Sequence, residues 1–324
     1  MIFVENINAL PALHLAAFMG DKRGIQAAIE SGTAVDIRAN TAQDYGWFLH
    51  NVTPLMVAAG SPNKTVSAMR LLLSLGADPL AKSSGEVSAL WYAVSSGDSS
   101  RVQLLLEATN YSIEFTNNGI GVINEAAEAG DLASVNLLLN AGASPHPFGK
   151  ADGYTNAAFY EIPLFSAARG GNAACVEALI RAGVPAIVSD NDKQTALAYA
   201  TTADVVAMLV KSGCPLNVFD RYGYSELDAA LEAHREDVVR ALVAAGTSLE
   251  MRNQGGLPVL IRHCGSLEIK ATMVQLLIEL GADIFARVYQ DSTALHLATH
   301  LITGDRHGVL GDVVKVLVIA GITC

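Results

Sequence analysis

Four side chains near the C-terminal end have the types and spacing of a metal site. His296 and His300 are four residues apart in a predicted helix, and Asp305 and His307 follow closely. Two imidazoles at this spacing share a helix face and can bind zinc, which takes three or four ligands in a fixed geometry. A structural role is the competing interpretation, because His296 has the same place in a recurring motif as His14. We favour the structural role.

Three other segments match catalytic or ligand-binding motifs only in part. Gly149-Lys150 lacks the upstream glycine and the following hydroxyl residue of a phosphate-binding loop. Asp190–Asp192 begins like a calcium loop, but Thr195 stands where the turn glycine belongs. His263-Cys264 is better explained as a degenerate copy of an Ala-rich helix end, and the serine motif G-x-S-x-G does not occur. We therefore expect no catalytic residue, cofactor or metal, and predict that the chain is not an enzyme.

A short motif recurs nine times along the chain. It reads PALHLAAFMGD at Pro11 and returns, for example, as TPLMVAAG at Thr53 and TALHLAT at Thr293. A closing glycine follows eight of the copies at a basic period of 33 residues, with insertions and one deletion: Gly32, Gly76, Gly142, Gly183, Gly213, Gly246, Gly281 and Gly321. Units of this length cannot each bury an apolar face alone, so they must stack.

Each unit carries signals for two helices and a hairpin. Small pairs such as Ala16-Ala17 allow the first helix to lie close to its neighbours. In Gly20-Asp21 and its equivalents, the glycine can end the first helix in the left-handed conformation and the aspartate can cap the second. Apolar residues at helical spacing, as in Val135–Leu139, would bury the second helix. The sequence predicts an all-α fold of stacked helix-turn-helix pairs.

The motif T-P-L-H-x-A-A, followed by two residues and then a glycine, resembles the ankyrin repeat. Nine imperfect copies cover residues 8–324, so the resemblance implies an ankyrin-repeat solenoid with projecting hairpins, in which the motif histidines bond between repeat loops. We interpret residues 1–324 as one solenoid domain, with insertions near 40–52, 146–160 and 301–311. The sixth repeat lacks three residues around Thr201–Asp204, which should shorten its first helix.

The composition excludes several classes of function. The net charge of −11, from 21 basic and 32 acidic residues, argues against a general binder of nucleic acid or anionic membranes. No apolar run approaches the ~18 residues of a membrane span. The four cysteines are scattered without a C-x-x-C pair, which favours a reducing compartment, and we expect the cytoplasm.

The ankyrin resemblance implies that the chain binds another protein, through the concave groove and hairpin tips. We expect a scaffold or an inhibitor. The alternative is a small-ligand-sensing module that uses an aromatic cleft between hairpins. A broad open surface would favour a protein partner, and a closed pocket with convergent polar groups would favour a ligand.

Aromatic and acidic residues are the candidates for partner contacts. Hairpin aromatics are typical of interface hot spots, although they can also pack within their own loops. Between Ser83 and Ala168 the charge is −7, which would steer a basic partner unless this surface is only solvated. The candidate partner-binding residues are Tyr45, Trp47, Phe48, Glu86, Glu128, Tyr154, Tyr160, Glu161, Tyr222, Tyr224 and Tyr289.

The last predicted helix is unusually apolar for the end of a repeat array. In Asp312–Ala320 the polar residues are Asp312 and Lys315. One neighbouring repeat covers one stripe of a helix, and an exposed terminal repeat normally has a polar outer face. We therefore expect further repeats, another copy or the partner to cover this end.

Overall fold

The computed structural model describes residues 10–39, 50–110, 116–117, 120–146, 162–264, 270–289, 292–301 and 309–321. In these ranges the chain forms nine pairs of short α-helices. The pairs are α1 (Ala12–Met19) and α2 (Lys22–Glu30), α3 (Pro54–Gly60) and α4 (Val66–Ser74), α5 (Ala89–Ser95) and α6 (Ser99–Ala108), α7 (Val122–Glu128) and α8 (Leu132–Asn140), α9 (Pro163–Arg169) and α10 (Ala173–Arg181), α11 (Ala196–Tyr199) and α12 (Ala203–Lys211), α13 (Glu226–Glu232) and α14 (Glu236–Ala244), α15 (Val259–Cys264) and α16 (Ala271–Glu279), α17 (Ala294–Leu301) and α18 (Val309–Ile319).

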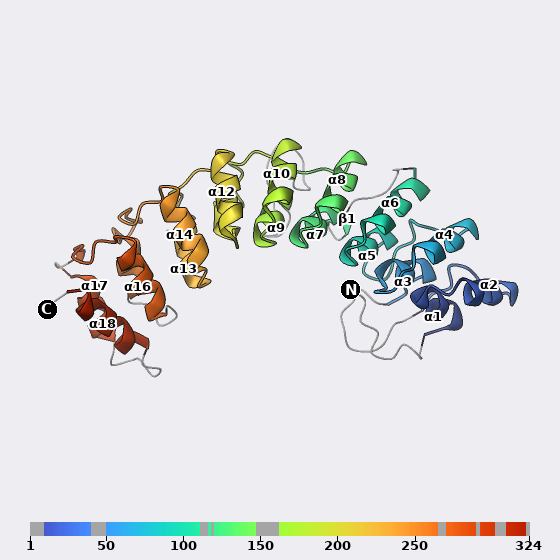
Figure 1. Cartoon of the computed structure of the whole chain (residues 1–324), viewed down its shortest axis with the longest axis horizontal. Helices are drawn as coiled ribbons and strands as arrows, with labels where there is room; N and C mark the ends of the chain where they lie inside the picture. The colour runs from blue at the N-terminus through green and yellow to red at the C-terminus, as the bar shows by residue number, and fades with distance from the viewer. Residues whose placement is uncertain are drawn as a thin grey trace. The chain divides into compact units, whose positions relative to one another are not determined.

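The helices belong to two compact units. The first unit comprises residues 1–170 and 177–184, and the second comprises 171–176 and 185–324, so α10 is divided between them. Within each unit, first helices pack on first helices and second helices on second helices (Figure 1), as α3 on α5 and α4 on α6, or α11 on α13 and α12 on α14. The predicted all-α fold of stacked pairs is confirmed. The grouping of residues 1–324 into one domain stays a prediction.

Extended structure is confined to the loops between repeats in the described part of the chain. Strands β1 (Thr116–Asn117) and β2 (Ile120–Gly121) form an antiparallel pair, with Thr116 opposite Gly121. Single bridges close other hairpins, including those between Lys82 and Ser88 and between Phe219 and Ser225. The bridge between Phe219 and Ser225 closes the hairpin that carries Tyr222 and Tyr224.

The predicted turn signals have the expected geometry. Gly20 and Gly97 have φ angles of 73° and 72°, in the left-handed region that favours glycine. The carboxylates that follow them cap the next helices: Asp21 accepts from the backbone N–H of Arg23 at 3.0 Å, and Asp98 accepts from Ser100 at 3.1 Å. The first and third pairs therefore turn where the Gly-Asp dipeptide predicts.

The third residue of the motif, Leu13 in PALH and Leu55 in TPLM, is part of the core in every repeat. Burying such a side chain contributes about 1.5–3 kcal/mol. These nine residues are all buried: Leu13, Leu55, Leu90, Ile123, Leu164, Leu197, Leu227, Val259 and Leu295. The motif histidine His14 is buried too, and its Nε2–H donates to the Val52 carbonyl at 3.0 Å, as the family resemblance implied.

Two irregular regions can be compared with the prediction. Helix α11 has four residues, so the sixth repeat has the shortened first helix expected from the deletion. Helix α18 begins at Val309, so the insertion near 301–311 ends earlier than predicted. The other two insertions lie largely outside the described residues.

Candidate functional site

Three consecutive hairpins of the second unit are shaped by the same local device. At each, a side-chain oxygen accepts from the backbone N–H groups two and four residues later, which fixes the loop. Asp220 Oδ1 accepts from Tyr222 at 2.8 Å and from Tyr224 at 2.9 Å. Asp190 and Asn253 make the equivalent bonds one repeat before and one repeat after.

The Asp190 and Asp220 hairpins are also joined to each other. Gln194 Nε2 donates to Asp220 Oδ2 at 3.0 Å, and the backbone N–H of Arg221 donates to the Asp192 carbonyl at 2.9 Å. The Arg221 guanidinium forms an ion pair with the Asp192 carboxylate. The loop that carries Tyr222 is therefore held from within and from its neighbour.

Three tyrosines project from the hairpins of this unit. The exposed fractions are 65 % for Tyr222, 46 % for Tyr224 and 74 % for Tyr289. Tyr289 lies beside the Asn253 hairpin. Its hydroxyl is 3.9 Å from the position that a Cβ atom on Gly256 would occupy. These three predicted residues are indeed exposed on hairpins.

A cavity of about 230 Å³ opens beside two of these tyrosines, and we call it the tyrosine cavity. It collects side chains from the Tyr222 hairpin, from the following hairpin and from the helices α13 and α15. Its lining residues are Tyr222, Gly223, Tyr224, Glu232, Asn253, Leu257, Arg262 and His263. The structure thus brings Tyr222 and Tyr224 together with polar residues that the sequence did not single out.

A buried ionic cluster lies at Arg262 and His263. The Asp228 carboxylate is completely buried and accepts from Arg262 Nε at 3.0 Å and Nη2 at 2.6 and 2.8 Å. It also accepts from His263 Nε2 at 2.8 Å and from the backbone N–H and hydroxyl of Ser225, both at 2.7 Å. This cluster joins α13 to α15.

The Asp228 carboxylate stays charged in this setting. Burial raises the pKa of the group, but hydrogen bonds from His263, Arg262 and Ser225, together with the Arg262 charge, outweigh burial and hold the pKa well below its usual range. For Glu226 on the same helix, the effect of burial on the pKa outweighs that of the hydrogen bonds. Burial raises its pKa, although Asn217, Val218 and Thr247 donate to its carboxylate.

The depressed pKa of Asp228 predicts a pH dependence of stability. An unfolded Asp has a pKa of about 3.9, so its native contacts contribute fully above about pH 5 and are lost progressively as the pH falls below that value. We expect Asp228→Asn to lower the free energy of unfolding at pH 5 and above. Below pH 5 the difference from wild type should shrink. Urea unfolding at pH 7, 5 and 3.5 measures this, and a difference as large at pH 3.5 as at pH 7 would contradict it. Glu226 titrates in both proteins, so its contribution cancels.

The architecture and the hairpins agree with one family. The family model described as ankyrin repeats (3 copies) matches residues 55–149, 123–220 and 164–253, which together span more than half of the chain. The chain belongs to the ankyrin repeat family.

Individual relatives agree with this assignment. The mouse B-cell lymphoma 3 protein homolog is 30 % identical over an alignment of 151 residues, and the match covers 35 % of this ankyrin chain and 34 % of the mouse protein. The human ASB11 ankyrin repeat domain superposes with a TM-score of 0.61 at 22 % identity, over 74 % of this chain and 99 % of that domain. The ankyrin repeat domain of Bcl-3, a member of the IkappaB protein family, gives 0.52 at 21 % identity, over 72 % and 99 %. These two structures show the shared fold.

The ankyrin motif explains why sequence reasoning missed the buried cluster. Asp228 occupies the histidine position of the motif in SELD, and Arg262-His263 occupies the Ala-Ala position one repeat later in LPVLIRHC. Each departure alone looks like a degenerate copy. Together they place a carboxylate opposite two basic side chains.

Two other predicted residues that the structure describes, Glu86 and Glu128, do not line the tyrosine cavity. Glu86 and Glu128 are exposed in the first unit, where Glu86 pairs with Lys82 at 3.6 Å. Glu128 receives two bonds of 2.9 Å from Arg169, so this carboxylate has a structural partner in the next repeat. Six candidates lie outside the described residues: Tyr45, Trp47, Phe48, Tyr154, Tyr160 and Glu161.

The metal and membrane expectations can be compared with the described part of this ankyrin chain. Within it, no group of three or more His, Cys, Asp or Glu residues is placed to hold a metal ion. Asp305 and His307 lie outside the described residues, while His296 Nδ1 accepts from the Thr293 hydroxyl at 2.8 Å. No helix in the described ranges is long and apolar enough to cross a membrane.

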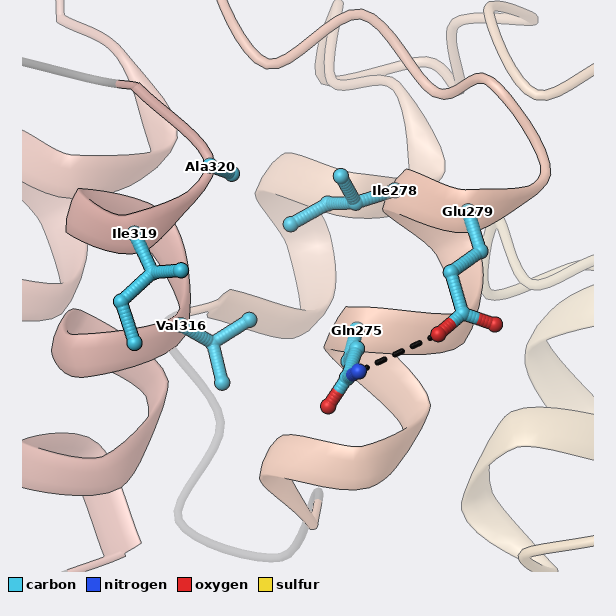
Figure 2. A pocket seen from close by; sticks show the side chains of 6 residues that line it. All are labelled: Gln275, Ile278, Glu279, Val316, Ile319 and Ala320. Carbon is cyan, nitrogen blue, oxygen red and sulfur yellow. Dashed lines mark hydrogen bonds between the residues drawn. The ribbon is translucent and has the colours of Figure 1, made fainter.

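The last ankyrin repeat leaves an apolar groove of about 300 Å³ between α16 and α18. Figure 2 shows Ile278 on one side of it and Val316 and Ile319 on the other. In α18, Val313 and Leu317 are buried, whereas Ile319 is 86 % exposed. The predicted burial of one stripe is confirmed, and the cover expected for this end stays a prediction.

Proposed function

We propose that this ankyrin protein is a scaffold or inhibitor that binds another protein on the hairpins and tyrosine cavity of its second unit. The observation that carries the proposal is the exposure of Tyr222, Tyr224 and Tyr289 on neighbouring hairpins. Hydrogen bonds within and between loops hold Tyr222 and Tyr224 in place before a partner arrives. Rigid exposed tyrosines supply much contact area at little entropic cost, as interface hot spots do.

Family membership supports a binding role without catalysis, because ankyrin repeats typically act as protein-interaction modules. One relative also supports a binding role, since Bcl-3 is described as a member of the IkappaB protein family. Cys214 and Cys264 are free and buried, and Cys175 is also buried, which supports a cytoplasmic location.

The size of the tyrosine cavity favours a protein partner over a small ligand. Pockets for small molecules usually have volumes of about 300–1,000 Å³ and enclose most of the ligand. At about 230 Å³ the tyrosine cavity is smaller, and it is flanked by exposed hairpins. It therefore suits one side chain of a larger partner.

We expect the triple variant Tyr222→Ala, Tyr224→Ala, Tyr289→Ala to bind its partner at least ~10-fold more weakly, because hot-spot residues each contribute about 1–2 kcal/mol or more. Partners captured by the intact chain would be identified by mass spectrometry and their affinities for both proteins compared. Phe285→Ala is the matched control, since Phe285 is 60 % exposed in the same unit but does not line the cavity. Equal binding by the wild type and the triple variant would refute the proposal.

Acidic residues of the first unit support an additional contribution from charge. Glu86 and Glu128 are exposed in a region with a net charge of −7, which would steer a basic partner. The ion pair with Arg169 reduces the contribution of Glu128 to the attraction of a basic partner. We propose that the acidic region accelerates association, while the tyrosines supply affinity.

A further inference from the structure

One of the three matched hairpins carries a donor that its loop does not use. The loop device needs only a side-chain oxygen, and Asp190 and Asp220 supply it with carboxylates. The third hairpin, which lines the tyrosine cavity, uses Asn253 instead, and its Oδ1 accepts from Gly255 and Leu257 at 3.0 and 3.1 Å. The amide nitrogen of Asn253 therefore adds two N–H donors beyond those that shape the loop.

These donors lie at the wall of the tyrosine cavity. Asn253 Nδ2 is 3.5 Å from the position that a Cβ atom on Gly223 would occupy, and both residues line the cavity. Gly223 has a φ angle of 85°, which favours glycine, so the space beside the amide is kept free of a side chain. Among the described residues, no hydrogen bond uses the Asn253 Nδ2 hydrogens.

Two buried lining residues supply a further donor and an acceptor. Arg262 Nη1 carries two hydrogens, and one of them is donated to the Leu257 carbonyl at 2.6 Å. The side chain of His263 is 4 % exposed, and its Nε2–H donates to the Asp228 carboxylate. A neutral imidazole that donates from Nε2 has its lone pair on Nδ1, and in the described part of the chain no group donates to that atom.

The charges of the lining favour a neutral ligand group. The Arg262 charge is balanced by Asp228, and Glu232 already takes part in an interaction within the protein. A cation in the cavity would meet the donors of Asn253 and Arg262. An anion would meet the lone pair of His263. A neutral group that both accepts and donates hydrogen bonds satisfies both sides.

We propose that the tyrosine cavity binds the primary amide of a Gln or Asn side chain of the partner. Its carbonyl oxygen accepts from Asn253 Nδ2 or Arg262 Nη1, and its NH₂ group donates to His263 Nδ1. Its methylene groups lie against the rings of Tyr222 and Tyr224. The cavity of about 230 Å³ equals the space of about eight water molecules, which accommodates one such side chain. This inference rests on the proposed function and adds the chemistry of the partner's anchoring residue.

The test selects peptides from a random library of dodecapeptides displayed on phage, with the intact chain as bait. Selected peptides should share Gln or Asn at one fixed position. In synthetic peptides, Met for Gln or Leu for Asn removes the amide at similar size, and Glu or Asp replaces its donor with a charged acceptor. Each replacement should weaken binding about 10-fold or more, because it leaves buried polar groups of the cavity unpaired.

Asn253→Asp tests the donor in the chain itself. Asp keeps the oxygen that the loop needs, as Asp220 does in the preceding hairpin, and removes both Nδ2 hydrogens. The preference for the amide over its apolar replacement should fall to about threefold or less. Gln254→Glu is the matched control, because it adds a carboxylate at the next position, which is exposed and outside the cavity lining, and it should keep the wild-type preference.

The outcomes separate this inference from the proposed function. Selected peptides without a shared amide residue, a preference for the amide that persists in Asn253→Asp, or an equal loss in Gln254→Glu would overturn the inference. So would the absence of any peptide that binds. If captured proteins still require the three tyrosines in those cases, the proposed function stands. Circular dichroism of each variant confirms that it is folded.

Discussion

Replacing Asp228 with Ala is expected to lower the free energy of unfolding by about 3–5 kcal/mol. The change removes the acceptor from Arg262 and His263, whose side chains are 8 % and 4 % exposed, and leaves them without compensation. A buried charge that loses its partner costs several kcal/mol because it has left water without a replacement. Urea unfolding followed by far-ultraviolet circular dichroism at pH 7 would measure the loss.

Two further variants show whether charge is the cause. Asp312→Ala removes an exposed carboxylate that pairs with Lys315 at 2.8 Å, and it should change stability little. Combining Asp228→His with Arg262→Ala and His263→Ala restores the residues of the ankyrin motif. This triple variant should be more stable than Asp228→Ala, because no buried charge is then left without a partner. A loss from Asp228→Ala similar to that from Asp312→Ala would show the cluster to be unimportant.

Replacing Arg101 with Met is expected to cost about 2–4 kcal/mol in the first unit. Arg101 is 4 % exposed, and its Nη atoms donate to the carbonyls of Ala59, Ser61 and Asn63 in the preceding repeat. These carbonyls lie at and just beyond the end of α3, where helix carbonyls lack partners within the helix. Met preserves much of the volume but leaves these carbonyls without a donor. Hydrogen bonds from a charged donor contribute about 1.5–3 kcal/mol each, and the variant regains part of this sum because it no longer buries a charged guanidinium.

Hydrogen exchange would show where this loss occurs. Amides of α3 to α6 should exchange faster in Arg101→Met, since stability in a repeat array depends on interfaces between neighbours. Arg181→Met is the control, because Arg181 is an exposed residue that pairs with Glu177 on its own helix. If protection in α3 to α6 stays at the wild-type level, the carbonyl contacts of Arg101 do not stabilise this interface.

The fold could be predicted from the sequence because its signals are local. The Gly20-Asp21 turn, the buried third position at Leu55 and the short α11 all follow from residues a few positions apart. The ionic pairs between repeats could not be found in this way. Asp228 and Arg262 are 34 residues apart, and Glu128 and Arg169 are 41 residues apart. Their pairing depends on how one repeat is aligned on the next, which insertions obscure.

The candidate site was predictable only in its outer layer. Tyr222 and Tyr224 could be identified as exposed hairpin residues, because polar residues and Gly223 surround them in a loop sequence. The carboxylate of Glu232 and the buried Arg262 reach the same cavity from two different repeats. That convergence is tertiary, so the three-dimensional arrangement was needed to see it.

The contacts between repeats have a consequence for synthesis of the chain. They join residues about one repeat apart, such as Ser95 with Glu125 at a separation of 30 and Asn63 with Phe18 at a separation of 45. Folding rates fall as the mean sequence separation of contacts grows, and here that separation is set by the repeat and not by chain length. A repeat emerging from the ribosome can therefore dock as soon as it is complete. Within each unit, the apolar surface at risk of aggregation during translation is limited to the most recently made repeat.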